Sequence, residues 1–389
     1  MATAVFLLLA SALADEPVEA TDPCEPGPKN RISALVLPAV GYNSTDGLGL
    51  GLGGQVFSRP KSVERGYAWK ASLGVWATQG LRYQSHYLSL DTQGKTSWIG
   101  TVGYRRWNDL RYAGEGGADI VVDYKDAERH NFLAGEYGFL GVAVPQKSGL
   151  SPYVQAYGRH VQLDPAAGGL LDVRQPYGSN GGTYTDLTVG VEWAHTDRWP
   201  LPIIGTRAEA GVSGGITVPT GASEPVGAVS VVHGEVIHWQ SLFGDRWVMG
   251  SRFVADRAFG LRPIFEQDVA GGRWRDDLGS DQLLSGYGRT RTRGNGVLAA
   301  MIESRSYLFG IQRKFWNFDL YASAYAEEGF LFADGRWGPH LPSLGAGPEF
   351  LWHGALQLRP YVAWGWRADS PGGPRAPRPQ FGISFLDPL

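Results

Sequence analysis

The chain has 389 residues, a formal net charge of -3 and 43% apolar residues, and its 55 glycines accompany 14 tryptophans, 17 tyrosines and 16 phenylalanines. So many apolar and aromatic residues exclude a disordered chain, and glycines without a three-residue register exclude a collagen-like protein. The slightly acidic balance gives no electrostatic basis for a nucleic-acid partner. Beyond the N-terminal apolar stretch there is no run of about 18 to 20 apolar residues, which excludes membrane-spanning helices.

The N-terminus has the features of a secretory signal peptide. Residues 4–14 read AVFLLLASALA and end in the small-x-small pattern that signal peptidase accepts, so we expect residues 1–14 to be removed by cleavage after Ala14, although no Lys or Arg precedes the apolar run. Residues 15–30 are acidic and proline-rich, which favours a periplasmic linker over a buried strand or helix. Cys24 in this linker is the single cysteine, so no intrachain disulfide is expected and no role is indicated for it.

Beyond the linker, the dominant pattern is an alternation of apolar with small or polar residues, which is typical of β-strands that have two different faces. In residues 47–53, Leu48, Leu50 and Leu52 fall on one face and glycines fall on the other. In residues 344–352, the apolar face ends in aromatic residues. Aromatic residues at the ends of apolar strand faces are typical of membrane-spanning barrels, because such rings prefer the lipid–water boundary.

About sixteen segments of this kind can be counted, and the connections between them alternate in length. We expect strands to start near residues 31, 47, 67, 82, 96, 128, 152, 184, 203, 226, 245, 296, 315, 342, 355 and 379. Long connections are expected near 108–127, 163–183 and 259–295, and short ones at the opposite rim. Outer-membrane barrels have short periplasmic turns and long extracellular loops. The sequence therefore predicts an all-β fold, a 16-stranded antiparallel transmembrane β-barrel over residues 31–389, in preference to a soluble propeller, for which no repeat is visible.

Two short strings resemble catalytic or cofactor motifs but stand in an unsuitable context. Gly49, Gly51 and Gly54 fit GxGxxG, yet they lie inside an alternating strand and open no helix, so no dinucleotide site is indicated. Ser213 in GVSGG fits GxSxG, but it lies in the middle of an expected strand and no strand-to-helix elbow follows it. An outer-membrane lipid hydrolase built around Ser213 is therefore the least favoured function.

The other polar residues inside expected strands indicate a lumen rather than a metal site. The eight histidines show no ligand spacing, and His233 and His238 would face opposite sides of one strand, so no metal and no cofactor are indicated. Glu303 and Arg305 share one strand face, and an ionised residue facing lipid would cost several kcal/mol, so we assign both to the lumen. A structural lattice of salt bridges is the alternative to a functional role for them.

Three stretches carry a resemblance to a known family: LPAVGYNSTDGLGLGLGG (37–54), WNDLRYAGEGG (107–117) and the region from LRPIFEQDVAGG to MIESRSYLF (261–309). They resemble the first hairpin, the third extracellular loop, and the sixth loop with the twelfth strand of the Omp85 superfamily. The similarity is to BamA/TamA-type barrels, also called the bacterial surface antigen (D15) domain. It implies a long sixth extracellular loop that folds into the lumen, and the long connection expected at 259–295 stands at the position of that loop.

The resemblance assigns roles to individual residues. Ser285, Gly286 and Tyr287 stand at the family's Arg-Gly-Tyr/Phe position. In the family, that arginine pairs inside the barrel with an acidic residue on strand thirteen. Glu327 stands where the acidic residue, usually Asp, is found, and Gly329 stands at the glycine of the same motif.

The loop arginine of the family is a serine here, so another residue is expected to take its place. Arg289 and Arg291 continue the loop motif, and Glu303 with Arg305 matches the Glu-x-Arg pattern on the following strand. We expect Arg289 or Arg291 to reach Glu327 or Glu303.

The function implied by the resemblance is not enzymatic. Members of this type insert or translocate proteins at the bacterial outer membrane, through weak pairing of the first and last strands. Pro38, which cannot donate a ladder bond, and Gly382 suit such a weak seam. Residues 15–30 are too few for a periplasmic POTRA domain, so we expect a member lacking POTRA domains. The expected partners are membrane lipid and either unfolded outer-membrane proteins or a POTRA-type protein in trans; a passive pore or structural barrel is the alternative.

Overall fold

The computed structural model describes most of the chain beyond residue 30. The described residues are 31–43, 47–59, 68–110, 131–146, 148–197, 202–221, 223–244, 246–269, 284–287, 293–313, 316–333, 335–338, 340–352, 356–366 and 378–386. The expected signal peptide, its cleavage site, the linker and Cys24 lie outside the described residues, and so do Arg289 and Arg291.

The described residues form nineteen strands, of which sixteen are long. The long strands are β1 (Arg31–Asn43), β2 (Gly47–Arg59), β3 (Trp69–Thr78), β4 (Tyr83–Thr92), β5 (Ser97–Leu110), β6 (Asn131–Ala143), β7 (Leu150–Asp164), β8 (Gly181–Thr196), β9 (Gly205–Pro219), β10 (Gly227–Ser241), β11 (Trp247–Gly260), β14 (Gly296–Arg313), β15 (Trp316–Ala333), β17 (Ser343–Trp352), β18 (Leu356–Gly365) and β19 (Arg378–Leu386). The short strands are β12 (Asp268–Val269), β13 (Arg293–Gly294) and β16 (Arg336–Trp337).

Helical structure in the described part is limited to short pieces. These are the α-helix α2 (Leu170–Arg174) and the 3-10 turns η1 (Gln79–Leu81) and η2 (Ile264–Glu266). No helix among the described residues has the length and apolar character that a membrane crossing requires.

The sixteen expected strand starts agree with the long strands. The largest differences occur at β6, expected near 128 and starting at Asn131, and at β8, expected near 184 and starting at Gly181. The expected third loop at 107–117 begins too early, because β5 continues through Leu110 and its pairing with β6 contains a bulge between Trp107 and Leu110. The two-residue periodicity was sufficient to find the strands but not the bulged end of β5.

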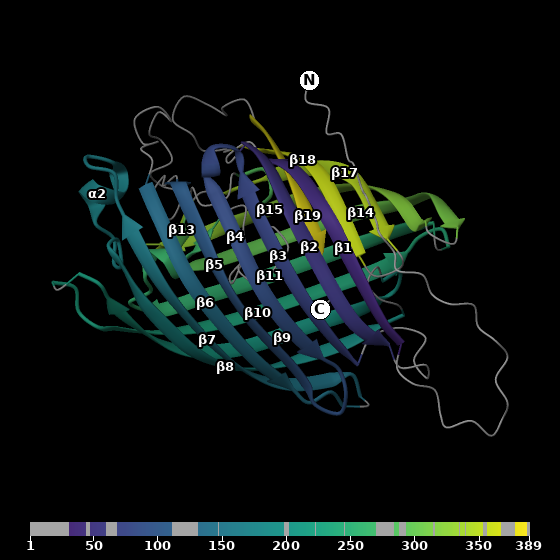
Figure 1. Ribbon diagram of the computed structural model, residues 1–389, viewed down its shortest axis with the longest axis horizontal. Coiled ribbons are helices and arrows are strands. Elements are labelled where there is room, and N and C mark those ends of the chain that lie inside the picture. Colours follow the sequence, from purple (N-terminus) through teal and green to yellow (C-terminus); the bar gives the residue numbers. More distant parts are fainter. Residues whose placement is uncertain are drawn as a thin grey trace.

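The long strands form one antiparallel sheet in which each pairs with the next along the chain. The short strands are bypassed, so that β11 pairs with β14 and β15 pairs with β17. The sheet curls into a barrel whose purple first strand lies beside its yellow last strand (Figure 1). Among the described residues, no ladder joins β19 to β1. We call this unpaired junction of β1 and β19 the seam.

The two faces of the sheet have opposite character. On β2, the side chains of Leu48, Leu50 and Leu52 are 47%, 62% and 52% exposed on the outward face, as the alternation predicted. On β17, Leu344 points outward, whereas Glu349 on the other face is buried. The outward face is therefore largely apolar although it is exposed, whereas buried polar residues such as Glu349 face the lumen.

Aromatic side chains lie over glycines of the neighbouring strand inside the lumen. Gly103 on β5 is directly opposite Tyr137 on β6, and a Cβ added to Gly103 would lie 2.3 Å from the tyrosine ring. Gly345 on β17 is likewise directly opposite Tyr325 on β15, and a Cβ added to Gly345 would lie 2.3 Å from that tyrosine ring. The glycines therefore provide the space in which large rings pack against the wall, which explains why glycine and aromatic residues are abundant together.

Two adjacent glycines on β9 allow this packing to be tested. A Cβ on Gly215 would lie 2.6 Å from the Tyr184 hydroxyl oxygen, whereas a Cβ on Gly214, on the other face, meets nothing within 4 Å. Tyr184 is buried and packs against Tyr157, with 6.2 Å between ring centroids, so the ring has no free space to move into. We expect Gly215→Ala to lower the free energy of unfolding by about 1 to 3 kcal/mol. Gly214→Ala should leave the free energy of unfolding nearly unchanged. Urea titration of both variants in micelles measures the two effects. Equal losses of stability in the two variants would contradict the packing argument.

Candidate functional site: a loop anchor inside the barrel

Residues 284–287 of the sixth loop form a turn that is packed into the lumen. The turn is closed by a hydrogen bond of 2.9 Å from the Tyr287 N–H to the Leu284 carbonyl. Leu284 is fully buried, in a cluster of apolar residues contributed by neighbouring strands of the barrel wall and by the β16–β17 connection: Val254, Val297, Ala299, Leu331 and Leu341. Burial of Leu284 fixes the turn against the wall, and we call residues 284–287 the loop anchor.

The centre of the loop anchor is the contact between Ser285 and Glu327 of β15. One carboxyl oxygen of Glu327 accepts two hydrogen bonds from Ser285, one from its backbone N–H at 2.7 Å and one from its hydroxyl at 2.6 Å. The Ser285 hydroxyl oxygen also lies 3.0 Å from the Tyr325 hydroxyl. Ser285 and Glu327 are 4% and 5% exposed, so this contact is shielded from solvent.

The next residue of the loop anchor touches the backbone of β18. The Gly286 N–H donates to the Ser343 hydroxyl at 2.9 Å. A Cβ at Gly286 would lie 2.3 Å from the Gly365 nitrogen and 2.4 Å from the Trp364 carbonyl carbon. No side chain other than hydrogen fits this approach, so glycine is required here by space.

Tyr287 extends the anchor to the residue just before β17 and the residue just after β18. Its hydroxyl lies 3.0 Å from the Pro342 carbonyl oxygen and 2.5 Å from the Trp366 carbonyl oxygen. The short turn thereby contacts β15, β17 and β18 together. Three neighbouring strands are tied to one point of the sixth loop.

Gly329, two residues beyond Glu327 on the same face of β15, makes room for the loop anchor. A Cβ at this position would lie 2.8 Å from the Leu298 carbonyl oxygen and 3.1 Å from both terminal carbons of Leu284. The Leu284 side chain therefore packs directly against the backbone of Gly329. Ser285, Gly286, Tyr287, Glu327 and Gly329 are thus brought together in one place.

Glu303 and Arg305 of β14 both face the lumen but do not pair with each other. Glu303 binds Arg359 of β18 at 3.3 Å, and the guanidinium of Arg359 lies over the Tyr325 ring, 4.6 Å from its centroid. Arg305 is buried and donates to the Pro202 carbonyl. Within the described part of the chain, Glu327 is bound by Ser285 and Glu303 by Arg359. The expectation that Arg289 or Arg291 reaches them concerns residues that are not described, and it stays a prediction.

The beginning of the sixth loop also enters the lumen, at a place that the sequence did not reveal. Ile264 and Phe265 of η2 are buried in an apolar cluster with side chains of β6, β7 and β8. Arg159 donates to the Phe265 carbonyl at 3.2 Å and lies 3.4 Å from Glu266, while Arg293 donates to the Ile264 carbonyl at 2.7 Å. An apolar pair directly after a proline, in an otherwise polar loop, was the only local signal for this contact.

Comparison with known proteins identifies the fold. No protein-family model and no curated protein sequence matches the chain. CdiB from Escherichia coli matches with a TM-score of 0.58 at 12% identity, over 97% of this chain and 67% of that chain. The BamA structure from Haemophilus ducreyi lacking POTRA domains 1-3 matches with a TM-score of 0.55 at 16% identity, over 98% of this chain and 75% of that chain. The chain has the barrel fold of BamA and CdiB.

The BamA-like barrel contains further polar contacts in its lumen, and the individual pairs were not expected from sequence. Glu209 on β9 accepts a hydrogen bond of 2.8 Å from the Tyr153 hydroxyl and lies 3.2 Å from His233 Nε2. Arg252 and Glu235 form a buried ion pair at 2.5 Å. All of these side chains come from the strands β7 to β11, so the contacts link nearby strands of the barrel wall to one another.

Ser213 lies in the lumen face of β9, where its side chain is 1% exposed. The residue continues an extended strand that pairs with β8 and β10 on its two sides. A nucleophile elbow requires a sharp turn from strand to helix that exposes the serine hydroxyl, and this geometry is absent at Ser213.

Proposed function

We propose that this chain is a bacterial outer-membrane barrel of the Omp85 kind that inserts or translocates other proteins by opening sideways at the seam. Residues 1–14 serve as the signal peptide, removed after Ala14, and residues 15–30 form a periplasmic linker before the barrel. The partners are membrane lipid and unfolded outer-membrane proteins or a POTRA-type protein in trans. The chain acts without a cofactor and is not an enzyme.

The seam is the observation that carries this proposal. Every other pair of neighbouring long strands is joined by a ladder, and only β19 and β1, among the described residues, lie side by side without one. Both strands contain a residue without a backbone N–H, Pro38 in β1 and Pro379 in β19. Proline removes a potential ladder hydrogen bond from each strand. Because no ladder has to be broken, these two strands separate at a lower cost than any other pair.

The loop anchor supports the same mechanism because it lies beside the seam. It fixes β15, β17 and β18, and β18 is the strand to which β19 is paired. The wall can therefore open at β19 while the strands behind it keep their positions. A passive pore is less well supported, since Ile264, Phe265 and Leu284 of the sixth loop are buried inside the barrel rather than leaving its lumen open.

The outward face supports a position in a membrane. Its exposed side chains include large apolar residues on strands around the barrel, such as Leu50 on β2, Leu140 on β6, Val212 on β9 and Ile302 on β14. Water would disfavour so large a continuous apolar surface, whereas a hydrocarbon layer accepts it. Closure of the remaining wall by ladders also keeps the backbone polar groups paired, as lipid requires.

A disulfide across the seam tests the proposal. Cysteines at Val36 and Ile383, in a Cys24→Ser background, should join β1 to β19 on oxidation. The protein is reconstituted in liposomes and a urea-denatured outer-membrane barrel is added, whose folding is followed by its mobility on unheated gels. We expect the protein to accelerate this folding at least about tenfold when reduced, and to lose the effect when oxidised.

The matched control places a disulfide where the wall is already paired. Val212 and Val232 are opposite each other on β9 and β10 and both point outward, so a cysteine pair there leaves the seam free. The oxidised control should keep its activity. Full activity of the Val36–Ile383 variant after complete oxidation would refute lateral opening.

A further inference from the structure

A contact inside the lumen joins the connection between β8 and β9 to the distant strand β14. Of this connection the structure describes Asp197 and residues 202–204, and we call these residues the inner turn. Pro202 and Ile203 are buried, the latter 2% exposed, whereas the next residue, Ile204, is 56% exposed. The buried side chain of Arg305 donates a hydrogen bond to the Pro202 carbonyl.

This contact requires the inner turn to lean into the lumen. Pro202 stands three residues before β9, and the wall continues from β9 through β10 and β11 to β14. Neighbouring strands are about 4.8 Å apart, so β14 lies about 14 Å from β9 along the wall. A turn that stayed at the rim above β8 and β9 would not meet Arg305. The inner turn therefore lies in front of β10 and β11.

Hydrogen bonds within the inner turn fix its shape. One carboxyl oxygen of Asp197 accepts the backbone N–H of Ile203 at 2.9 Å and that of Ile204 at 3.1 Å. The Asp197 N–H donates to the Ile204 carbonyl at 3.0 Å. The turn is therefore held together by Asp197 and held to the opposite wall by Arg305.

The direction of β8 places the inner turn at one mouth of the barrel. β8 begins at Gly181, after the long connection that contains α2, and it ends at Thr196. The inner turn follows β8, so it lies at the rim opposite to α2. Outer-membrane barrels have their long connections outside and their short turns in the periplasm. The inner turn therefore belongs to the periplasmic mouth.

The charge of Arg305 is not balanced by a neighbouring acid. Its partners are the Pro202 carbonyl and the ring of Tyr321, whose centroid lies 5.8 Å from the guanidinium carbon. Glu303, two residues earlier on β14, is bound to Arg359 instead. In the part of the chain that the structure describes, no carboxylate pairs with Arg305. A buried cation with neutral partners is unfavourable, and displacement of the inner turn would return it to water. One charge-assisted hydrogen bond thus opposes the cost of a buried charge.

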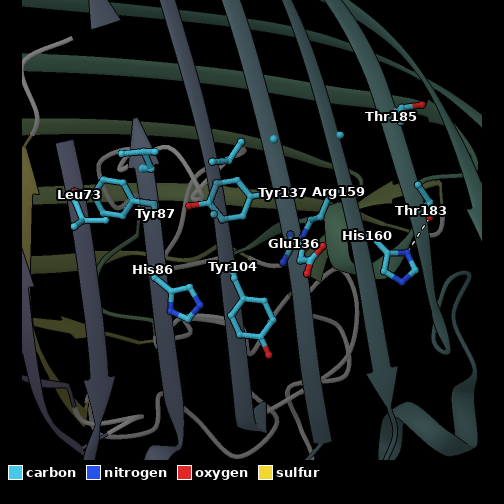
Figure 2. A pocket seen from close by; sticks show the side chains of 15 residues that line it. Leu73, His86, Tyr87, Tyr104, Glu136, Tyr137, Arg159, His160, Thr183 and Thr185 are labelled. Carbon is cyan, nitrogen blue, oxygen red and sulfur yellow. Dashed lines mark hydrogen bonds between the residues drawn. The ribbon is translucent and has the colours of Figure 1, made fainter. Parts of the chain in front are cut away.

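The other end of the lumen is obstructed by the sixth loop. Figure 2 shows Tyr137 and Arg159 on the neighbouring strands β6 and β7, where they are opposite each other. Tyr137 belongs to the apolar cluster that buries Phe265 of η2, and Arg159 donates to the Phe265 carbonyl at 3.2 Å. A passage through the barrel therefore requires both η2 and the inner turn to move.

We propose that the inner turn is a gate at the periplasmic mouth of the lumen, held closed by the hydrogen bond from Arg305 to the Pro202 carbonyl. When this bond breaks, the turn moves away from β14, Arg305 regains contact with water, and the lumen becomes accessible from that side. The proposed function concerns sideways opening at the seam, so the gate is a second movable part of the barrel. Only its assignment to the periplasmic side rests on the outer-membrane position of the chain.

Two adjacent residues of the inner turn make the gate measurable with cysteines. Ile203→Cys and Ile204→Cys are each made in a Cys24→Ser background and treated in micelles with a bulky water-soluble maleimide. Ile204→Cys should react rapidly, because position 204 is exposed. Ile203→Cys should react at least about tenfold more slowly, because it is reached only when the turn opens. Equal rates for the two cysteines would overturn the proposal.

Arg305→Ala removes the bond that holds the inner turn. It should accelerate the reaction of Ile203→Cys at least about tenfold, the effect expected for loss of one charge-assisted hydrogen bond, and leave Ile204→Cys unchanged. Asp197→Ala loosens the turn itself and should act in the same direction without altering the barrel wall. Each variant is first shown to be folded by its mobility on unheated gels. No acceleration in the folded variants would overturn the gate.

Ser323→Ala is the matched control in the lumen wall. Ser323 is directly opposite Arg305 on β15 and is 4% exposed, but its hydroxyl donates to the Gly347 carbonyl at 3.1 Å and not to the inner turn. The reaction of Ile203→Cys should therefore be unchanged in Ser323→Ala. Acceleration as large as in Arg305→Ala would indicate general loosening of the wall and would overturn the gate.

Ion conductance in planar bilayers separates a gate from a contact that only stabilises the turn. Arg305→Ala is combined with Arg159→Ala, which removes a contact of η2 at the other end. The double variant should conduct more than the two single variants together, because both obstructions are weakened. A double variant that conducts no more than Arg159→Ala alone would show that the inner turn does not obstruct the lumen. Neither measurement uses the insertion activity, so its failure would leave the gate intact.

Discussion

Glu327→Ala should release the loop anchor from the barrel wall. The substitution leaves the N–H and the hydroxyl of Ser285 without the carboxyl oxygen that accepts both, at a place with no access to water. Loss of an acceptor for buried donors, together with the cavity, should lower the free energy of unfolding by about 3 kcal/mol. Urea titration in micelles measures this loss. Added protease should also cut between Val269 and Leu284 faster than in the wild type.

The neighbouring residue provides a matched control. Glu328 is also a glutamate on β15, but it points outward, and its contact with His340 at 3.4 Å joins two side chains that are 66% and 38% exposed. Glu328→Ala should therefore change the free energy of unfolding by less than about 1 kcal/mol and leave the protease pattern unchanged. If both alanine variants behave alike, the Ser285–Glu327 contact does not hold the loop.

A double-mutant cycle separates this contact from the cavity that alanine creates. Ser285→Ala removes the hydroxyl donor but keeps the backbone N–H, so its effect should be the smaller one. The coupling energy between Ser285→Ala and Glu327→Gln should be about 1 kcal/mol or more if the two side chains are bound to each other. Additive effects would show that Glu327 acts on the loop through the backbone N–H alone.

The positions of the strands could be predicted from sequence because a two-sided wall imposes its alternation on every strand. Leu48, Leu50 and Leu52 point outward whatever their exact partners are, so local pattern is sufficient. The Gly–aromatic contacts needed the register as well. Gly345 could be placed on the lumen face from its own segment, but its position opposite Tyr325 depends on the β15–β17 pairing.

The loop anchor could be located by family resemblance, but its chemistry differs from what that resemblance implies. The position of the family arginine holds Ser285, and the sequence pattern pointed only to other arginines as substitutes. The structure shows that a backbone N–H and a short hydroxyl reach Glu327 directly. A backbone donor is the same for every residue except proline, so no side-chain motif could have indicated it.

Contacts between distant parts of the chain were beyond sequence reasoning for a different reason. The contact of η2 with the barrel wall depends on strands that are distant in sequence from the sixth loop. Ile264 and Phe265 gave a local signal in the sixth loop, but the buried residues of their cluster come from β6, β7, β8, β10, β11 and α2.

Gly286→Ala should destabilise the loop anchor strongly, because two backbones meet at this residue. The added Cβ would lie 2.3 Å from the Gly365 nitrogen and 2.4 Å from the Trp364 carbonyl carbon. These atoms belong to the end of β18, which is held by ladders to β17 and β19 and cannot move aside cheaply. The φ angle of Gly286 is not positive, so alanine adds no conformational strain that would obscure the clash.

The clash should expel the loop anchor and cost about 3 kcal/mol of unfolding free energy, with the same new protease cleavage as Glu327→Ala. Gly214→Ala, whose Cβ meets open space, is the control for the change from glycine to alanine in the same barrel. The contact is reciprocal, since a Cβ on Gly365 would lie 2.7 Å from the Gly286 carbonyl oxygen. Once either substitution has expelled the turn, the second has nothing left to disrupt, so the double variant should be hardly less stable than the more damaging single one. Fully additive losses would mean that the turn stays in place and that β18, not the loop, yields to the added methyl groups.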